Sequence, residues 1–282
     1  MTNIRAALLQ TLVSDSKEKN LETARRAALQ AAEASPDVLC LPEMFCCPYE
    51  TESFPRYAEE AEGPVWQFCS RLAAECGVWL IAGTMPERDE AGRIFNTSFV
   101  FDRKGRQAAR CRKAHLFDVD IQGGQSFRES DTLSPGDALT VFDTEFGRLG
   151  LCVCYDLRFP EWIRLMALEG AQAVFVPASF NPTSGPAHWE LLFRARAVDN
   201  QFFLAGAAPA ENPAASYRSW GHTIAVDPWG TVLGQLDREP GILPVSFDLS
   251  LLSKIRRELP LLKQRRKDLY SLLPLPETFY DG

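Results

Sequence analysis

Glu43, Lys113 and Cys154 each stand at the end of an apolar, strand-like stretch of the sequence. In α/β folds the ends of strands hold side chains at the mouth of a crevice, so these residues are candidates for one active site. A cysteine attacks as a thiolate, which requires a base for its proton or a nearby cation that lowers its pKa. Glu43 could be that base, and Lys113 could stabilise the thiolate and then an oxyanion. The three together indicate nucleophilic catalysis on a carbonyl carbon.

Each of these residues also has an ordinary structural interpretation. Glu43 could be a turn residue, Lys113 a surface charge, and Cys154 a core residue like its neighbour Cys152. The spacing alone does not show that the three side chains meet in the folded protein.

The other cysteines and the histidines do not form a pattern of metal ligands. The pair Cys152-x-Cys154 has no matching second pair, so a structural zinc site is not expected. A disulfide framework is not expected in a chain of this length in a reducing compartment, and most cysteines should be small buried apolar residues. The cysteines are Cys40, Cys46, Cys47, Cys69, Cys76, Cys111, Cys152 and Cys154, and the histidines are His115, His188 and His222.

Composition limits the class of protein and its partners. The 282 residues are 46% hydrophobic and 24% charged, which is typical of a globular protein, and no linker divides them, so a single domain over 1–282 is expected. The net charge of −7 argues against nucleic acid or an anionic membrane as the main partner. We expect a cytoplasmic protein, since no apolar run approaches about 20 residues and the first residues lack a signal-peptide pattern.

Hydrophobic periodicity predicts strands that alternate with helices, and therefore a layered α/β architecture. The pattern alone does not decide between one mixed sheet and two packed sheets. Strands are expected at 4–10, 37–41, 78–83, 96–102, 106–113, 148–154, 173–176, 202–207, 222–227 and 242–248. Helices are expected at 17–34, 66–76, 161–170, 187–200 and 249–267.

Three segments of the chain resemble the signature blocks of the nitrilase, or carbon–nitrogen hydrolase, superfamily. They are Leu-Pro-Glu-Met-Phe (41–45), Arg-Lys-Ala-His-Leu-Phe-Asp (112–118) and Cys-Tyr-Asp-Leu-Arg-Phe-Pro-Glu (154–161), in the order of that family. The likeness continues through 127–130, 133–137, 185–190, 194–200 and 220–222. The blocks around 115–137 and 185–192 are most similar to the omega-amidase branch.

The resemblance implies a four-layer α-β-β-α sandwich in a homodimer or a larger homo-oligomer. The segment at about 249–282 would then contribute to the dimer contacts. It also implies a catalytic triad of Glu43, Lys113 and Cys154, with Glu129 positioning the lysine and the substrate. Lys113 and the backbone N–H of Tyr155 would receive the oxyanion. No metal or organic cofactor is expected.

The omega-amidase resemblance implies a substrate with a carboxylate, for which Arg158 is the candidate partner. The structural alternative for Arg158 is an ion pair with Glu161 or Asp156. Phe180, Tyr49 and Phe45 are candidates for the pocket wall, and the alternative for all three is packing in the core.

The implied activity is hydrolysis of the terminal amide of 2-oxoglutaramate or 2-oxosuccinamate through a cysteine thioester. Alternatives are an amidase for deaminated glutathione, a hydrolase of N-carbamoyl amides and, more remotely, a non-catalytic scaffold. His115 could be a general base, but the family pattern makes it structural, as we also expect for His188 and His222. The basic stretch 254–267 could bind RNA or lipid, but a docking helix between subunits fits its leucine spacing better.

Overall fold

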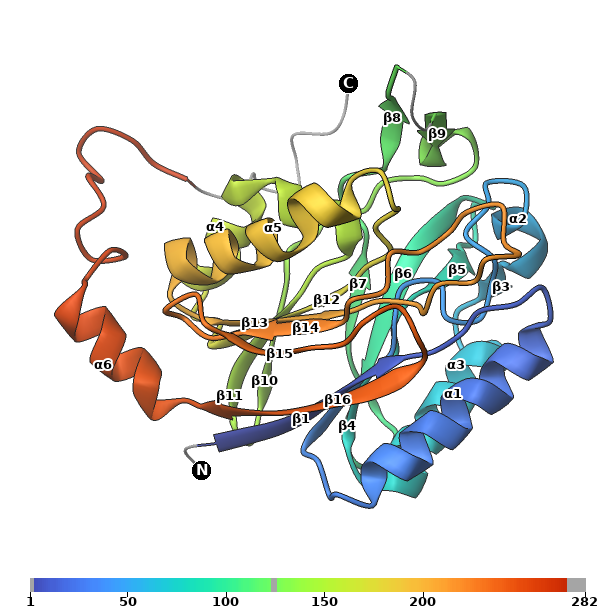
Figure 1. Ribbon diagram of the computed structural model, residues 1–282, viewed down its shortest axis with the longest axis horizontal. Helices are drawn as coiled ribbons and strands as arrows, with labels where there is room; N and C mark the ends of the chain where they lie inside the picture. The colour runs from blue at the N-terminus through green and yellow to red at the C-terminus, as the bar shows by residue number, and fades with distance from the viewer. Residues whose placement is uncertain (1–2, 123–125, 273–282) are drawn as a thin grey trace.

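The computed structural model describes residues 3–122 and 126–272, which form two β-sheets packed face to face (Figure 1). The first sheet has the order β16-β1-β2-β4-β6-β5-β3, with β7 also paired to β6, and the second has the order β10-β11-β12-β13-β14-β15. The strands of the first sheet are β1 (Asn3–Gln10), β2 (Val38–Cys40), β3 (Glu59–Glu60), β4 (Trp79–Ile81), β5 (Met85–Arg88), β6 (Ile94–Phe101), β7 (Gln107–Arg112) and β16 (Gly241–Asp248). The strands of the second are β10 (Thr140–Thr144), β11 (Gly147–Leu151), β12 (Ala173–Pro177), β13 (Phe203–Ala207), β14 (Ile224–Val226) and β15 (Val232–Gln235).

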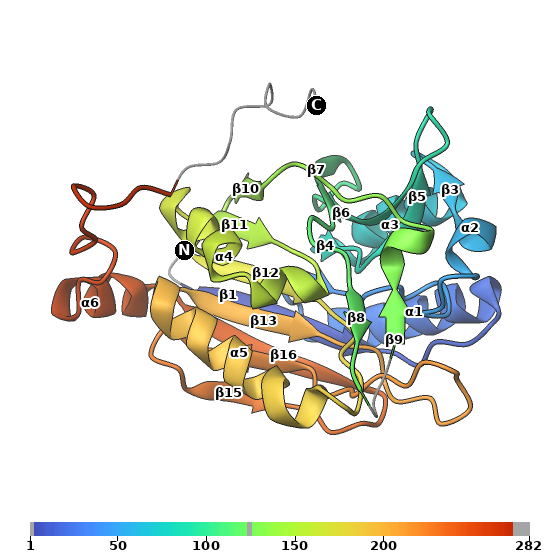
Figure 2. The ribbon, with the colours of Figure 1, turned by 90° about the horizontal axis from the view of Figure 1, so that it is seen from above.

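Helices cover the outer face of each sheet, which gives the predicted four-layer α-β-β-α sandwich (Figures 1 and 2). The first sheet is covered by α1 (Lys17–Ala32) and α3 (Pro64–Cys76), and the second by α4 (Pro160–Leu168) and α5 (Gly185–Asn200). The remaining elements are α2 (Phe54–Tyr57), α6 (Ser250–Glu258), the hairpin of β8 (Asp118–Asp120) and β9 (Ser126–Arg128), and the 3-10 helices η1 (Glu129–Asp131) and η2 (Cys154–Arg158).

The alternation of side chains along β2 separates the two apolar layers of the first sheet. Leu39 and Leu41 join the cluster beneath α1 and α3, whereas Val38 and Cys40 point into the cluster between the two sheets. Because successive side chains of a strand face opposite sides, an apolar run of this kind is buried on both faces. The short apolar run that precedes Glu43 is therefore a central strand, paired in parallel with β1 and β4.

Helices α1 and α3 have end signals that are readable from the sequence. The Ser16 hydroxyl accepts a hydrogen bond from the Lys19 N–H and caps the start of α1. Gly77 ends α3 in the left-handed conformation, with φ of +64°, which glycine adopts at little cost. Small side chains, Ala24 and Ala28, face the core from α1 and allow it to lie close to α3.

Two predicted elements end earlier than expected, and some strands were not predicted. The expected helix over 249–267 is α6, which ends at Glu258, because Pro260 lacks an N–H and disfavours helix in the residue before it. One unpredicted strand is β15, which has four residues and a partly exposed pattern that includes Gly234. The strand predicted over 148–154 ends at Leu151, which changes the geometry at Cys154.

Candidate active site

Glu43 is held by a tight turn that follows β2. The Gly83 backbone after β4 packs against this turn so closely that an added Cβ would lie 2.1 Å from the Pro42 carbonyl oxygen. The neighbouring Thr84 donates its N–H to the same carbonyl and accepts the Met44 N–H at 2.8 Å. The chain on both sides of Glu43 is thus fixed to the end of β4, and the fully buried carboxylate has a defined position.

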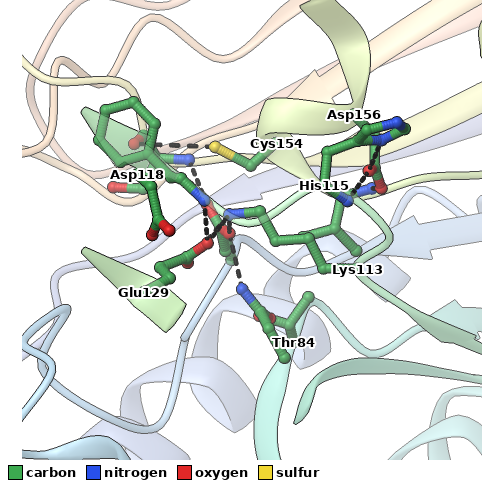
Figure 3. A network of polar contacts seen from close by, with 12 residues as sticks. Thr84, Lys113, His115, Asp118, Glu129, Cys154 and Asp156 are labelled. Carbon is green, nitrogen blue, oxygen red and sulfur yellow. Dashed lines mark hydrogen bonds and ion pairs between the residues drawn. The ribbon is translucent and has the colours of Figure 1, made fainter. Parts of the chain in front are cut away.

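Lys113 follows β7 and extends its ammonium between two buried carboxylates (Figure 3). Its Nζ lies 3.1 Å from Glu43 Oε1 and 2.9 Å from Glu129 Oε2, and all three side chains have no exposed surface. Tyr49 completes the group, since its hydroxyl lies 3.2 Å from the Nζ and donates to Glu129 Oε1 at 2.7 Å. Buried charges are tolerable only when paired in this way.

Cys154 does not end a strand but begins η2, with its backbone in the left-handed region at φ of +46°. A non-glycine residue in this region is unusual and is found where the surrounding structure holds it. The Asp156 carboxylate supplies that hold, because its Oδ2 accepts the Val153 N–H at 3.0 Å across the turn. The apolar run Leu151–Val153 extends the strand pattern in the sequence, which explains the wrong prediction.

Ser179, which follows β12, joins the nucleophile to the base through its backbone. Its N–H donates to Glu43 Oε2 at 2.7 Å, and its carbonyl oxygen lies 3.9 Å from the Cys154 Sγ. The carboxylate also lies close enough to the thiol for its charge to raise the thiol pKa. Glu43 is therefore placed to receive the proton of Cys154.

Burial and neighbouring charges set the protonation states of this group. Burial raises the pKa of the Cys154 thiol well above its ordinary value, and Glu43 raises it further against the opposing effect of Lys113. Burial also raises the pKa of Glu43, which Lys113 lowers and Glu129 raises. For Lys113 burial lowers the pKa, but the carboxylates of Glu129 and Glu43 outweigh burial and hold it well above its ordinary value. The resting site thus contains a thiol beside a permanent cation, and a base is needed to form the thiolate.

A small pocket opens beside the Cys154 thiol. Arg158 lies at its edge, with its guanidinium 4.7 Å from the centre of the Phe180 ring and its Nη1 3.1 Å from the His188 Nδ1. Neither of the carboxylates considered as structural partners, Asp156 or Glu161, forms an ion pair with Arg158 in the described chain. The lining residues are Phe117, Cys154, Tyr155, Arg158, Ser179, Phe180, Ser184 and Tyr217.

Three further predicted site residues, Tyr155, Tyr49 and Phe45, lie in different places. Tyr155 lines the pocket and is the second residue of η2, where the first N–H groups of a helix have no partner within the helix. Tyr49 lies at the lysine rather than at the pocket beside the thiol. Phe45 is 1% exposed, packs in the core beneath α1 and α3, and lines neither the pocket beside the thiol nor the cavity beside Glu43.

Two residues of the site, Asn96 and Tyr217, were not predicted from the sequence. Asn96 donates to Glu43 Oε1 at 2.8 Å from within β6, a fully buried strand that also contains Thr97 and Ser98. Tyr217 donates its hydroxyl to the Ser179 carbonyl at 2.5 Å from a long loop. A buried polar residue in a strand was the available signal for Asn96, whereas nothing in the loop distinguishes Tyr217.

The histidines have mainly structural contacts, and α5 also carries an ion pair one turn apart. The Nδ1 of His115 donates to Asp156 and its ring stacks on Phe159, while the His222 carbonyl accepts the indole N–H of Trp189. His188 lies in α5, and its Nδ1 contacts the Arg158 guanidinium. Arg194 and Glu190 lie 3.3 Å apart, as their spacing on α5 predicts.

Within residues 3–122 and 126–272, no group of three or more histidine, cysteine or acidic side chains could hold a metal ion. Over the same described ranges, every helix is too short or too polar to cross a bilayer. All eight cysteines are free thiols.

Comparison with known proteins places this geometry in a family. The model of the carbon-nitrogen hydrolase family matches residues 5–257, which is most of the chain. The chain belongs to the carbon-nitrogen hydrolase family. It is therefore a hydrolase of carbon–nitrogen bonds in amides, and its fold and the order of its motifs agree with that membership.

Individual members of the carbon-nitrogen hydrolase family resemble the chain over nearly its whole length. It is 47% identical over 272 residues to the omega-amidase NIT2 of Mus musculus, covering 96% of this chain and 98% of that protein. The crystal structure of Saccharomyces cerevisiae Nit3, a member of branch 10 of the nitrilase superfamily, superposes with a TM-score of 0.87 at 38% identity, covering 94% and 97% of the two chains. A mutant amidase from Nesterenkonia sp. AN1, with an acetamide moiety added covalently at its active-site cysteine, superposes with a TM-score of 0.78 at 29% identity, covering 94% and 95%.

Proposed function

We propose that this protein hydrolyses the terminal amide of a short omega-amido dicarboxylate, 2-oxoglutaramate or 2-oxosuccinamate, through a thioester on Cys154. The full-length similarity to omega-amidase NIT2 supports this substrate class. The covalent addition of an acetamide moiety to the active-site cysteine of the Nesterenkonia amidase supports Cys154 as the nucleophile.

The observation that carries the proposal is the position of Arg158. Its guanidinium borders the pocket that contains the nucleophile, and within the described residues it forms no ion pair with a carboxylate. A guanidinium binds a carboxylate through two parallel hydrogen bonds, so it suits the far end of a dicarboxylic monoamide. The pocket that Cys154 and Arg158 line measures only about 10 Å³, which is room for about one water molecule. Binding therefore requires Arg158 to move off the Phe180 ring as it takes up the substrate carboxylate.

The reaction follows from the contacts of Glu43, Lys113 and Cys154. Glu43 takes the thiol proton and Cys154 attacks the amide carbon, forming the C–S bond. The ammonium of Lys113 and the N–H of Tyr155 stabilise the resulting oxyanion. Glu43 then transfers its proton to the nitrogen, the C–N bond breaks and ammonia leaves. A water molecule, deprotonated by Glu43, attacks the thioester carbon, and the C–S bond breaks to release the acid and the thiol.

A panel of substrates tests the proposal most directly. Purified protein is given 2-oxoglutaramate, 2-oxosuccinamate, deaminated glutathione, an N-carbamoyl amino acid and an uncharged aliphatic amide, and product release is measured for each. We expect the first two to have the highest kcat/KM. A clear preference for one of the other three would overturn the substrate assignment, and a complete lack of turnover would favour a scaffold.

Substitution of Arg158 tests the role of its charge. Arg158→Gln should raise KM for 2-oxoglutaramate about 10- to 100-fold, the value of a charge-assisted pair, and change KM for the uncharged amide little. Arg148→Gln, at the opposite end of β11 from the nucleophile, is the matched control. Equal losses on both substrates in Arg158→Gln would indicate a structural arginine.

A further inference from the structure

The guanidinium of Arg196 holds the end of the turn that carries Arg158. Arg196 lies on α5, and its side chain is only 12% exposed. Its Nε donates to the carbonyl oxygen of Leu157 and its Nη2 donates to that of Arg158, both at 3.1 Å. Leu157 and Arg158 are the last two residues of η2, so one planar side chain binds two consecutive carbonyls of its final turn.

The sequence explains why this turn needs a donor from another element. The last carbonyls of a helix have no partner within the helix. In a 3-10 helix the Leu157 carbonyl would accept the N–H of the third residue after it, but that residue is Pro160, which has no N–H. Arg196 supplies a donor in its place, so the backbone at Arg158 is fixed by a side chain of α5.

The two ends of the Arg158 side chain are held with unequal strength. The backbone of its turn accepts two hydrogen bonds from a largely buried cation, whereas its guanidinium donates to the Nδ1 of His188 and contacts the Phe180 ring. His188 is exposed, so water competes for that hydrogen bond. The guanidinium can therefore leave Phe180 and bind a substrate carboxylate while the start of the side chain stays in place.

The start of η2 has a separate anchor. The Asp156 carboxylate accepts the Val153 N–H and holds the left-handed backbone at Cys154. Arg196 binds the opposite end of the turn. Loss of Arg196 should therefore disturb the position of Arg158 more than that of the thiol.

We propose that Arg196 is a positioning residue for substrate specificity: it fixes the backbone of Arg158 and so determines how tightly the carboxylate of the substrate is bound. The inference rests on the proposed function, because it assumes that Arg158 binds that carboxylate. The described residues that line the pocket beside the thiol do not include Arg196, so its effect is exerted through Arg158. A binding group must lie within about 0.5 Å of its productive position, which makes a fixed backbone valuable.

The test is a double-mutant cycle, measured on 2-oxoglutaramate and on an uncharged aliphatic amide. Arg196→Gln should raise KM for 2-oxoglutaramate about tenfold, a loss no greater than that in Arg158→Gln, and should change kcat and the KM for the uncharged amide little. In the Arg158→Gln background, Arg196→Gln should raise KM no further, because the side chain through which it acts has already lost its charge. Arg194→Gln, on the same helix with its side chain 54% exposed, is the matched control.

A milder variant separates the geometry of Arg196 from its charge. Arg196→Lys keeps a cation, but an ammonium is a single point charge that does not bind two carbonyls as the planar guanidinium does. It should raise KM for 2-oxoglutaramate by less than Arg196→Gln does, and urea denaturation should show a folded protein. The test therefore does not depend on the stability of Arg196→Gln.

The outcomes distinguish this inference from the proposed function. If Arg158→Gln raises KM for 2-oxoglutaramate and the Arg196 variants do not, the inference is wrong and the proposed function stands. An equal rise on both substrates, or an equal effect of Arg196→Gln in both backgrounds, would make Arg196 a structural residue only. If Arg158→Gln itself leaves that KM unchanged, the proposed role of Arg158 fails and the inference fails with it.

Discussion

The Asp156 carboxylate accepts two hydrogen bonds from His115, one from its backbone N–H at 2.9 Å and one from its ring Nδ1 at 2.8 Å. Its other oxygen accepts the Val153 N–H. His115 is two residues after Lys113, and Asp156 is two residues after Cys154. One buried side chain therefore sets the position of the lysine segment relative to the nucleophile turn, although it does not contact the reacting atoms.

Asp156→Asn should lower both stability and turnover. An amide has one acceptor oxygen where the carboxylate has two, so at least one buried N–H loses its partner, at a cost of roughly 2–3 kcal/mol. Urea denaturation measures the loss, and kcat should fall because the left-handed turn at Cys154 is less firmly held. Asp131→Asn, on the exposed surface of η1, should change neither quantity, and an equally stable, fully active Asp156→Asn variant would contradict the role described.

Cys154→Ala should abolish product release from every amide while the protein remains folded. The matched control is Cys152→Ala, two residues earlier and fully buried, which removes only packing and should cost about 1–2 kcal/mol of stability. Its kcat should remain close to that of the wild type. Intact-mass measurement during turnover should detect the acyl adduct in the wild type and in Cys152→Ala, but not in Cys154→Ala.

Glu129→Gln should slow the reaction without preventing binding. The carboxylate contacts the Lys113 Nζ, the Tyr49 hydroxyl and, at 2.7 Å, the Phe117 N–H, so its loss lets the ammonium shift within the site. A displacement of about 1 Å can reduce kcat about 100-fold. Tyr49→Phe, which removes only one of these contacts, should have a smaller effect. Steady-state kinetics on 2-oxoglutaramate distinguish a loss of kcat from a change in KM alone.

The acid limb of the pH–rate profile should report Glu43. As the base, Glu43 must be ionised, so kcat/KM is retained above its pKa and lost as the pH falls through it. Burial and the charge of Glu129 raise that pKa, so the limb should lie above the ordinary glutamate value of about 4.3. In Glu129→Gln the limb should move to lower pH, because one raising charge is gone. A limb that stays in place would show that another group controls it.

Glu87→Gln should destabilise the edge of the first sheet and weaken the acid dependence of stability. Glu87 is 1% exposed and accepts hydrogen bonds from Arg112 and Thr97. Burial opposes the lowering of its pKa, but the bond from Arg112 prevails, so the folded pKa lies below the ordinary value. Its stabilisation is present above pH ~4.3 and is lost as the pH falls through the depressed value. Removal of the charge should cost about 3 kcal/mol at neutral pH, measured by urea denaturation, and progressively less as the pH is lowered below about 4.3.

Most of the layered fold could be predicted, since apolar runs such as 37–41 and 78–83 can only be central strands when they are this short and bounded by turns. The predicted helix over 249–267 is longer than α6, because the leucine spacing continues beyond Pro260, where the backbone cannot remain helical. Pairing between distant strands, and hence the choice of two sheets over one, has no local signal in the chain.

The candidate site was only partly predictable, because contacts between distant segments have no local signal in the sequence. Glu43, Lys113 and Cys154 stand out because each interrupts or ends an apolar run, and family motifs surround them. The positions of Asn96 and Tyr217 depend on tertiary packing, which periodicity does not encode. Phe45 illustrates the converse, because it is adjacent to the site in sequence and yet faces the core beneath the helices.

Glu43 and Lys113 are carried by the first sheet, whereas Cys154 and Ser179 follow strands of the second. Neither sheet alone has both a base and a nucleophile, so turnover requires the two halves to have docked in register. During refolding, activity should therefore return after far-ultraviolet circular dichroism, which reports helices and strands before their assembly. Enzyme activity in this protein is in effect a kinetic probe of the last step of folding.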